Sequence, residues 1–276
     1  MAEPRFIHLR VHSEHSLLAG AVPVKKIAQL AASAGMPAVA LTDTNAAFAA
    51  LEFSDGCAKL GVQPIVGSQM DLCYLPPEPG RQPYKPAAVV LLVQSEAGWL
   101  NLMKLQSCAH LHDANGDGLP QLTLDDLERH SEGLICLTGG PDGPLGRLLR
   151  QNQRPKAEEF LRRMAAIFPT RLYVELQRHP VDGGLPEAER LSERGSVELA
   201  YALDLPLVAT NDAYFAKADM HQAHDALICI ADGAFLGQEE RRDRQDTGDD
   251  PQTVPQPEEA GDGMRAQVVL LTYGER

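Results

Sequence analysis

Short apolar segments alternate with longer amphipathic ones over the first 236 residues of the chain. Phe6 to Val11 predicts a strand, and the helical spacing of apolar residues from Pro23 to Ala34 predicts a helix. Pro23 suits the first turn of that helix, and Gly35 suits the position just past its end. The same pattern predicts strands at Ala38–Leu41, Gln63–Val66, Val89–Val93, Leu134–Leu137, Leu172–Leu176 and Leu207–Thr210, and helices at Ala46–Lys59, Ala97–Cys108, Lys156–Ile167, Glu187–Leu203 and Asp219–Ala231.

This alternation is typical of a parallel sheet whose two faces are covered by helices. About seven strand–helix units fit a βα barrel better than an open sheet. The sequence therefore predicts an α/β fold of the barrel type. In such a barrel the functional residues lie at the carboxyl ends of the strands.

Two segments interrupt the pattern. Leu75 to Pro86 holds five prolines and predicts a surface loop. From Gly237 onward the chain is rich in Pro and Gln, with ten acidic residues against five basic ones, which favours disorder. We therefore expect a barrel domain over residues 1–236. We expect an acidic tail over residues 237–276, which does not pack on the barrel from about residue 240.

Charge and cysteine content exclude some classes of protein. The chain carries a net charge of −13 and only 5% aromatic residues, which argues against a protein that coats DNA or RNA. Five cysteines without a C-x-x-C pair favour reduced thiols over a disulfide framework or a zinc ribbon. The N-terminus has no apolar signal core, and no apolar run approaches the roughly 20 residues of a membrane helix. The expectation is a cytoplasmic chain with little direct nucleic-acid binding and no membrane partner.

Polar residues follow several predicted strands and point to one candidate site. His12, Asp43, His179 and Asp212 all lie at such strand ends, and imidazole and carboxylate are ligands of Zn, Mn and Fe. Each residue alone has an ordinary explanation, because a strand-end Asp is usually a helix cap and a single His is usually a hydrogen-bonded polar group. Their recurrence at four strand ends favours convergence at one barrel mouth.

Several sequence blocks resemble a known family. HLRVHSEHSLLAG, GMPAVALTD, GVQPIVGSQ, LYVELQRH and LPLVATND are similar to blocks of the PHP (polymerase and histidinol phosphatase) family. The similarity is closest to the start of the bacterial replicative DNA polymerase III alpha subunits, and it covers residues 3–236. The resemblance implies a distorted seven-stranded βα barrel related to the TIM barrel. It also implies that complete family sites hold a metal cluster, which supports exonuclease or phosphoesterase activity.

The chain departs from the ligand pattern of that family. The kept ligand positions are His12, Asp43, His179 and Asp212, and the substituted ones are Arg10, Thr44, Gln69, Ala88 and Tyr214. An Arg in the cavity places a fixed positive charge where a cation would bind, and it can pair with Asp43 or Asp212. The resemblance therefore implies a degenerate site without catalytic residues, which holds no cofactor beyond at most one weakly bound divalent metal.

Other motifs give weaker signals. The Gly-rich loop at Leu137–Gly140 offers backbone amides to a phosphate, but it lacks the GxxxxGK[ST] pattern, so a tight turn is the preferred interpretation. His12 to Ser16 lacks the G-x-S-x-G context of a serine hydrolase. His221 and His224 lie three residues apart on a predicted helix without a third ligand, which favours a surface or capping role.

Two functions remain open from the sequence. The first is a non-catalytic scaffold or interaction domain, the N-terminal PHP part of a replicative polymerase alpha subunit without its polymerase domains. Its partners, as the resemblance implies, are the remainder of the alpha subunit and the proofreading exonuclease subunit. A truncated or frameshifted reading frame would explain the change of composition after Arg242. The alternative is a stand-alone, metal-dependent phosphoesterase, against which the five substituted ligand positions argue.

Overall fold

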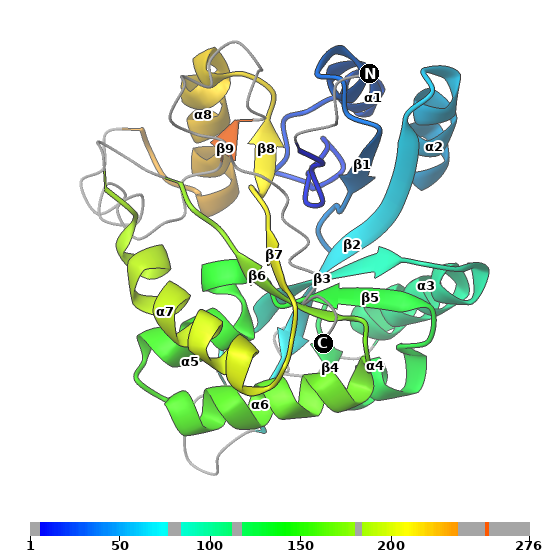
Figure 1. The fold of residues 1–276 in the computed structure, drawn as a ribbon. Helices are drawn as coiled ribbons and strands as arrows, with labels where there is room; N and C mark the ends of the chain where they lie inside the picture. Colours follow the sequence, from blue (N-terminus) through cyan, green and yellow to red (C-terminus); the bar gives the residue numbers. More distant parts are fainter. Residues whose placement is uncertain (1–5, 77–83, 112–117, 180–183, 237–251, 254–276) are drawn as a thin grey trace. The chain divides into compact units, whose positions relative to one another are not determined.

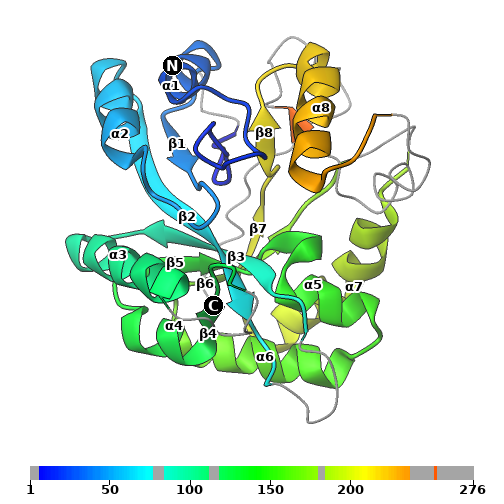
Figure 2. The ribbon, with the colours of Figure 1, turned by 180° about the vertical axis from the view of Figure 1, so that it is seen from behind.

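The computed structural model describes residues 6–76, 84–111, 118–179, 184–236 and 252–253. These residues form two compact units, shown from opposite sides in Figures 1 and 2. Within the described residues, unit 1 takes 6–66, 177–187 and those from 209 onward, and unit 2 takes 67–176 and 188–208. No helix in these described ranges has the length and apolar character needed to cross a bilayer.

Unit 1 is organised around residues 8–13, which lie between β1 (Ala38–Leu41) and β8 (Ala213–Phe215). On one side, the Ala40 amide donates to the His8 carbonyl at 2.8 Å; on the other, the Ala213 amide donates to the Arg10 carbonyl at 3.1 Å. The remaining elements of this unit are α1 (Val24–Ser33), α2 (Ala50–Lys59), the 3₁₀ helix η2 (Ala218–Met220), α8 (His221–Asp232) and β9 (Gln252–Thr253).

The predicted strand from Phe6 to Val11 is wrong as a regular strand. A bend at Leu9 interrupts the ladder, and only Val11 forms an isolated parallel bridge, with Ala213. The apolar pattern predicted burial correctly, because Val11 is buried. Although the backbone of this segment is irregular, it forms hydrogen bonds with both neighbouring strands.

The core of unit 1 forms where α1 and α2 pack beside β1. The buried face of α1 carries Val24, Ile27, Ala28 and Ala31, at the spacing of an amphipathic helix. All four residues of β1 are buried, as expected for a central strand between covered faces. The cluster is completed by Val11, Val22, Val39, Leu41, Ala49, Phe53, Cys57, Val62, Ala213 and Ala216.

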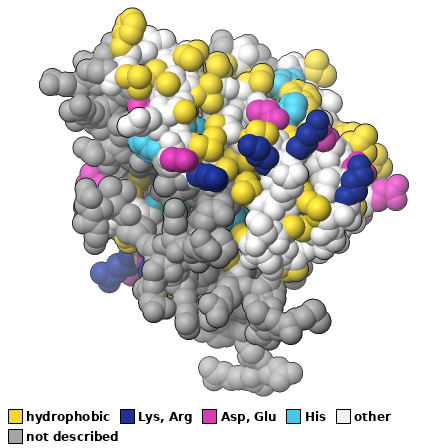
Figure 3. All heavy atoms as spheres, turned by 90° about the horizontal axis from the view of Figure 1, so that it is seen from above, with side chains coloured by type: hydrophobic (Ala, Val, Ile, Leu, Met, Phe, Trp, Pro, Cys, Tyr) yellow, Lys and Arg dark blue, Asp and Glu magenta, His cyan; other side chains and the backbone are white. Residues whose placement is uncertain are grey.

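Large hydrophobic side chains also remain on the surface of unit 1. Leu17, Phe48 and Leu51 are 76%, 72% and 83% exposed, and the ring of Phe48 lies edge-on to that of His15 at 6.5 Å. Figure 3 shows one face of the molecule, where hydrophobic side chains gather and Lys and Arg side chains are few and separate. Among the described residues of that face there is no continuous basic stripe.

The tail prediction needs one correction. β9, at Gln252–Thr253, pairs in parallel with β8, Gln252 opposite Ala213 and Thr253 opposite Phe215. The expectation that nothing beyond about residue 240 packs on the body is therefore wrong at this point. An uncovered strand edge offers free backbone donors and acceptors, and even a polar segment can satisfy them. The rest of the predicted tail, 237–251 and 254–276, lies outside the described residues.

Unit 2 contains most of a seven-stranded sheet of mixed direction, with strand order β1-β2-β3-β5-β6-β7 and β4 beside β2. β2 serves both units, because its first residues pair with β1 and its later residues with β3. The strands are β2 (Gln63–Cys73), β3 (Ala87–Val93), β4 (Leu122–Thr123), β5 (Leu134–Leu137), β6 (Leu172–Leu176) and β7 (Leu207–Ala209), and the helices are α3 (Glu96–Leu111), α4 (Leu124–His130), the 3₁₀ helix η1 (Gly140–Asp142), α5 (Pro144–Arg150), α6 (Arg154–Ile167) and α7 (Glu187–Ala202).

The prediction of an all-parallel sheet is wrong at β3, which runs antiparallel to both β2 and β5. A parallel neighbour needs a crossover, usually a helix, and the sequence between β2 and β3 predicts only a proline-rich loop. The α/β class with a seven-stranded sheet is confirmed, and its strands neighbour one another in chain order apart from β4, as in a distorted βα barrel.

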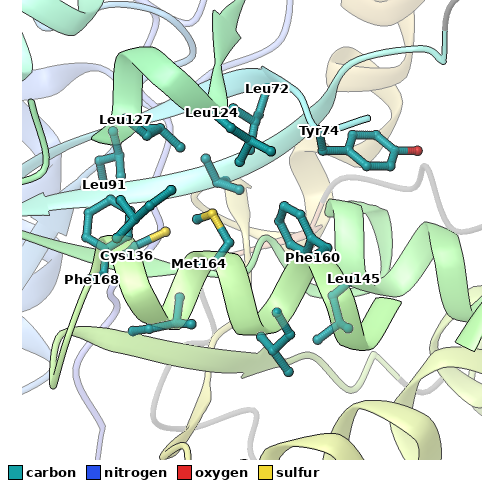
Figure 4. Packing of buried hydrophobic residues seen from close by; sticks show 14 of the residues in the cluster. Leu72, Tyr74, Leu91, Leu124, Leu127, Cys136, Leu145, Phe160, Met164 and Phe168 are labelled. Atoms are coloured by element: carbon teal, nitrogen blue, oxygen red, sulfur yellow. The ribbon is translucent and has the colours of Figure 1, made fainter. Parts of the chain in front are cut away.

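Helices α3, α4, α5 and α6 cover the sheet of unit 2 with apolar side chains. Figure 4 shows Phe168, just after α6, beside Leu91 and Cys136 of the sheet, whereas Phe160 of α6 lies toward Tyr74, with ring centroids 6.2 Å apart. These side chains are at most 4% exposed. The helix α4, which the sequence pattern missed, begins with a capping box in which the Thr123 and Asp126 side chains each bind the other's backbone amide.

Candidate functional site

The substituted and kept ligand positions of unit 1 come from three places in the chain. Arg10 and His12 lie two residues apart in the segment 8–13, and Asp43 lies two residues after the end of β1. Asp212 precedes β8, and Tyr214 lies within it. Because β1 and β8 flank the segment 8–13, all of these side chains are brought to one region of unit 1.

The Asp212 carboxylate contacts two side chains, the guanidinium of Arg10 and the imidazole of His12. The Arg10 Nε–H donates to Asp212 Oδ1 at 2.9 Å, and His12 Nε2 lies 2.9 Å from the same oxygen. Since an ionised carboxylate only accepts hydrogen bonds, Nε2 of His12 carries the proton in this contact. Of the two partners that the sequence offered to Arg10, Asp212 is the one found. Arg10 and His12 are 3% and 0% exposed, whereas the Asp212 side chain is 20% exposed.

The charge balance around Asp212 keeps it ionised. Burial opposes ionisation, but the Arg10 charge, the His12 hydrogen bond and the nearby His179 outweigh it, so the pKa of Asp212 lies below its ordinary value. The backbone of Asp212 has a φ of +42°, a conformation that L residues rarely adopt and that costs free energy. The ion pair supplies a compensating interaction for this strained residue.

Asp43 is bound by neutral donors. The Ser13 amide and the Ser16 hydroxyl both donate to its Oδ1 at 2.7 Å, and the Ser13 hydroxyl donates to its Oδ2 at 2.7 Å. Asp43, Ser13 and Ser16 are all buried. Three short hydrogen bonds from an amide and two hydroxyls stabilise this carboxylate.

His12 connects these two carboxylates. Its Nδ1 lies 3.1 Å from Ser16 Oγ, the hydroxyl that binds Asp43, while its Nε2 contacts Asp212. The ring of Tyr214 stacks on the His12 ring with centroids 4.1 Å apart and planes within 1°. Tyr214 replaces a ligand of the family pattern. Its ring packs instead against His12, which is a kept ligand position.

The other predicted positions lie nearby in unit 1 or belong to unit 2. Nε2 of the half-buried His179 is 3.3 Å from the Asn211 carbonyl, next to Asp212. The Thr44 amide donates to Ser16 Oγ at 3.1 Å. Gln69 lies on β2 and Ala88 on β3, both in unit 2, where Asp71 rather than Gln69 is the strand partner of Ala88.

These residues do not fit a metal cluster. A divalent ion bound at Asp212 Oδ1 would displace Arg10 and His12 from that oxygen, and it would face the guanidinium charge of Arg10. The Asp43 oxygens are directed at an amide and two hydroxyls. Among the residues that the structure describes, no group of three or more His, Cys, Asp or Glu side chains is placed to hold a metal ion.

The Gly-rich loop after β5 contains an internal anion contact. Gly139 and Gly140 both have positive φ, +83° and +65°, and the Gly139 amide donates to the carboxylate of buried Glu175 at 2.9 Å. The Glu175 amide in turn donates to the Thr138 hydroxyl. The loop therefore binds a carboxylate of its own unit, which agrees with a structural turn and explains why glycine is needed there.

Of the two helical histidines, His224 has a structural contact. Its ring is buried, and Nε2 lies 2.6 Å from the Ala19 carbonyl, so it ties α8 to the loop that carries Ser16. His221 is exposed and lies edge-on to Phe215. The exposed His221 agrees with the surface role that the spacing favours, but the buried His224 does not, because it makes a tertiary contact with the Ala19 carbonyl.

The sequence interpretation missed Ser13, Ser16 and Glu14. The two serines bind Asp43, and the Glu14 carboxylate accepts the Val24 amide at 2.7 Å, which caps α1 where Pro23 has no capping side chain. The available signal was the density of small polar residues directly after His12, which is typical of a loop that satisfies its own backbone.

Comparison with known proteins gives a consistent family. A family model described as PHP domain matches residues 8–179. The DNA polymerase III subunit alpha of Caulobacter vibrioides is 46% identical over 239 residues, which cover 86% of this chain and 20% of that protein. The corresponding subunit of Rickettsia bellii is 39% identical over 231 residues, 84% of this chain and 19% of that protein. The chain thus spans about a fifth of the length of these relatives.

Among solved structures, an amidohydrolase from Chromobacterium violaceum, solved with bound sulfate and no metal, superposes with a TM-score of 0.48 at 14% identity. The superposition covers 80% of this chain and 96% of that one.

Proposed function

The chain belongs to the PHP domain family, and on that premise we propose that it is the PHP domain of a DNA polymerase III alpha subunit, serving DNA replication as a scaffold. In this role it binds other subunits and performs no chemistry of its own. The proposal extends to its partners, the remainder of the alpha subunit and the proofreading exonuclease subunit. Its place of action is the cytoplasm.

One observation carries the non-catalytic part of this proposal. Arg10 forms an ion pair with Asp212, in the position where the complete sites of the family would hold a cation. A hydroxide-generating site needs free carboxylate and imidazole electron pairs to bind metal and to lower the pKa of bound water. With Asp212 paired and Asp43 bound by Ser13 and Ser16, few such electron pairs are available.

The surface of unit 1 supports a binding role. Leu17, Phe48 and Leu51 expose large apolar side chains, which in a soluble domain are typical of contacts with another polypeptide. The hydrophobic face in Figure 3 shows few basic side chains, which supports a protein partner over direct contact with DNA.

Two assays on the full chain test the proposal. In the first, the purified chain is mixed with the proofreading exonuclease subunit of Caulobacter vibrioides, and complex formation is followed by size-exclusion chromatography with light scattering. A stable complex is the expected result. Failure to bind this subunit and the remaining part of the alpha subunit would contradict the scaffold role.

The second assay measures hydrolysis of p-nitrophenyl phosphate with Mn²⁺ present, which tests the alternative of a metal-dependent phosphoesterase. We expect no hydrolysis that depends on the site. Activity that disappears in both His12→Ala and Asp212→Asn would support the enzyme instead. Activity that persists in both variants would come from a contaminant and leave the scaffold proposal standing.

A further inference from the structure

A second histidine of the segment 8–13 lies in surroundings unlike those of His12. His8 is 2% exposed and lines a small pocket with apolar side chains of α1 and β1, among them Ile27, Leu30 and Val39. The bend at Leu9 turns His8 toward this pocket, on the same side as Val11, which also lines it. The imidazole is thus part of the contact between α1 and the strands beneath it.

Both ring nitrogens of His8 lack a hydrogen-bond partner among the described residues. Its one ring contact is with Phe6, edge-on at 4.6 Å. The buried His12 and His224 differ, because each has a polar partner within 3.1 Å. A buried polar group without a partner costs free energy even when neutral, and an unpaired buried charge costs far more.

From this geometry we propose that His8 makes the packing of α1 sensitive to acid: α1 stays packed only while the imidazole is neutral, and protonation releases it. The positive charge would lie in a pocket whose other lining residues are all apolar. The lowest free-energy response is for α1 to move away and let water reach the ring.

The charged groups of the surrounding elements do not compensate. Lys25 and Lys26 of α1 are exposed, and β1 carries no charged residue. Glu14 binds the first amide of α1, Glu52 of α2 lies 3.8 Å from Lys25, and Arg10 is paired with Asp212. Apart from His8 itself, every residue that lines the pocket is apolar.

The direction of the pH effect follows from burial. Desolvation lowers the pKa of His8 from 6.5 to about 4 in the folded chain. Between these two values the released form binds a proton and the packed form does not, so the packed form loses stability as the pH falls. The stability of the packed form is therefore highest above pH 6.5, falls as the pH decreases to about 4, and is lowered no further by His8 below that pH.

Hydrogen exchange of the α1 amides tests this, with rates corrected for the intrinsic effect of pH. In the unmodified chain, protection of residues 24–33 should fall by about two orders of magnitude between pH 6.5 and pH 4. Protection of β3, in the core of unit 2, should change less. In His8→Leu, which keeps the apolar volume and removes the titrating ring, the α1 protection should not show this fall.

Further variants keep the test decisive. If His8→Leu does not fold, His8→Asn replaces it: it is less stable at every pH, but it also lacks the fall between pH 6.5 and pH 4. The control His110→Asn, at an exposed histidine of α3, should keep the full effect. An equal fall in the His8 variants would overturn the proposal. So would an NMR titration in which His8 protonates near pH 6.5 while α1 stays protected.

Discussion

The guanidinium of Arg10 neutralises the Asp212 carboxylate, where a metal-binding relative would use a bound metal ion. The difference matters for stability, because the cation is part of the chain and does not depend on the supply of metal. The Arg10 side chain is almost fully buried, so removing it leaves a carboxylate with a strained backbone and one remaining partner, His12.

Arg10→Ala should therefore destabilise the chain by about 3 kcal/mol, the usual cost of breaking a buried pair by removing one partner. Thermal unfolding followed by circular dichroism measures this. The double variant Arg10→Ala/Asp212→Asn should regain part of the loss, because it removes the unpaired charge as well. An unchanged Tm in Arg10→Ala would show that the pair contributes nothing to the fold.

The hydroxyls around Asp43 lead to a second expectation. Ser16→Ala removes a donor to Asp43 and an acceptor for the Thr44 amide, and should cost about 2 kcal/mol, as for hydrogen bonds to charged groups. Ser33→Ala, at an exposed hydroxyl of α1, is the matched control and should change stability by less than about 0.5 kcal/mol. Equal effects of the two substitutions in urea unfolding would contradict the role given to Ser16.

Asp212 also predicts a dependence on pH in a range below that of His8. Because its folded-state pKa lies below the ordinary value, the stabilisation is complete above the unfolded pKa of about 4 and is lost as the pH falls through the folded value. Urea unfolding between pH 5 and pH 2 should show a smaller loss of stability in Asp212→Asn than in the unmodified chain. Parallel curves for the two proteins would mean that Asp212 has no lowered pKa.

Close approaches of backbone decide which helical glycines are replaceable. In α3 of unit 2, a Cβ on Gly98 would lie 1.8 Å from the Gly133 carbonyl oxygen, so the helix must carry glycine there. In α2 of unit 1, a Cβ on Gly56 would meet only the Ala28 side chain, at 3.9 Å. Both glycines lie inside helices, where glycine is otherwise unfavourable.

The two alanine substitutions should therefore act in opposite directions. Gly98→Ala should destabilise by at least about 2 kcal/mol through overpacking. Gly56→Ala should stabilise by about 0.5–1 kcal/mol, because alanine loses less backbone freedom on folding. Differential scanning calorimetry of both variants checks the signs, and a stabilised Gly98→Ala would rule out the close approach to Gly133.

At the scale of elements, hydrophobic periodicity predicted the long helices and central strands well. β1, β5 and β6 have the predicted bounds, and α1, α6 and α7 differ by one or two residues. The pattern missed α4 and α5, whose short length gives periodicity little to act on. It also shortened β2, because the polar Ser68, Gln69 and Asp71 continue the strand through pairing with β3.

At the scale of the whole molecule, the departures from the ligand pattern predict that metal is not retained. Chain purified and dialysed without chelator should contain Mn, Zn and Fe in clearly substoichiometric amounts, measured by plasma mass spectrometry. The physical reason is that Arg10 and the donors of Asp43 compete for the ligand oxygens. About two or more metal ions per chain would require a clustered site and contradict this expectation.

The position of the candidate site was predictable from sequence, but its internal bonding was not. Strand ends placed Arg10, His12, Asp43 and Asp212 in one region because neighbouring strands bring their ends together. The internal bonding is the pairing of Arg10 with Asp212 and the binding of Asp43 by Ser13 and Ser16. A pattern of hydrophobic and polar positions does not show which of these contacts form, because Ser13 and Ser16 lie 30 and 27 residues from Asp43 in the chain.

Arg10 and His12 share one oxygen of Asp212, and this has a consequence for how the site can evolve. Replacing Arg10 with a metal ligand removes the charge that holds Asp212 before other lost ligands are restored, so that first step lowers stability without gaining a metal. Replacing Tyr214 first would disturb the stack on His12 without restoring the other ligands. At Arg10 and Tyr214, a single substitution toward a metal ligand therefore begins with the loss of a stabilising contact.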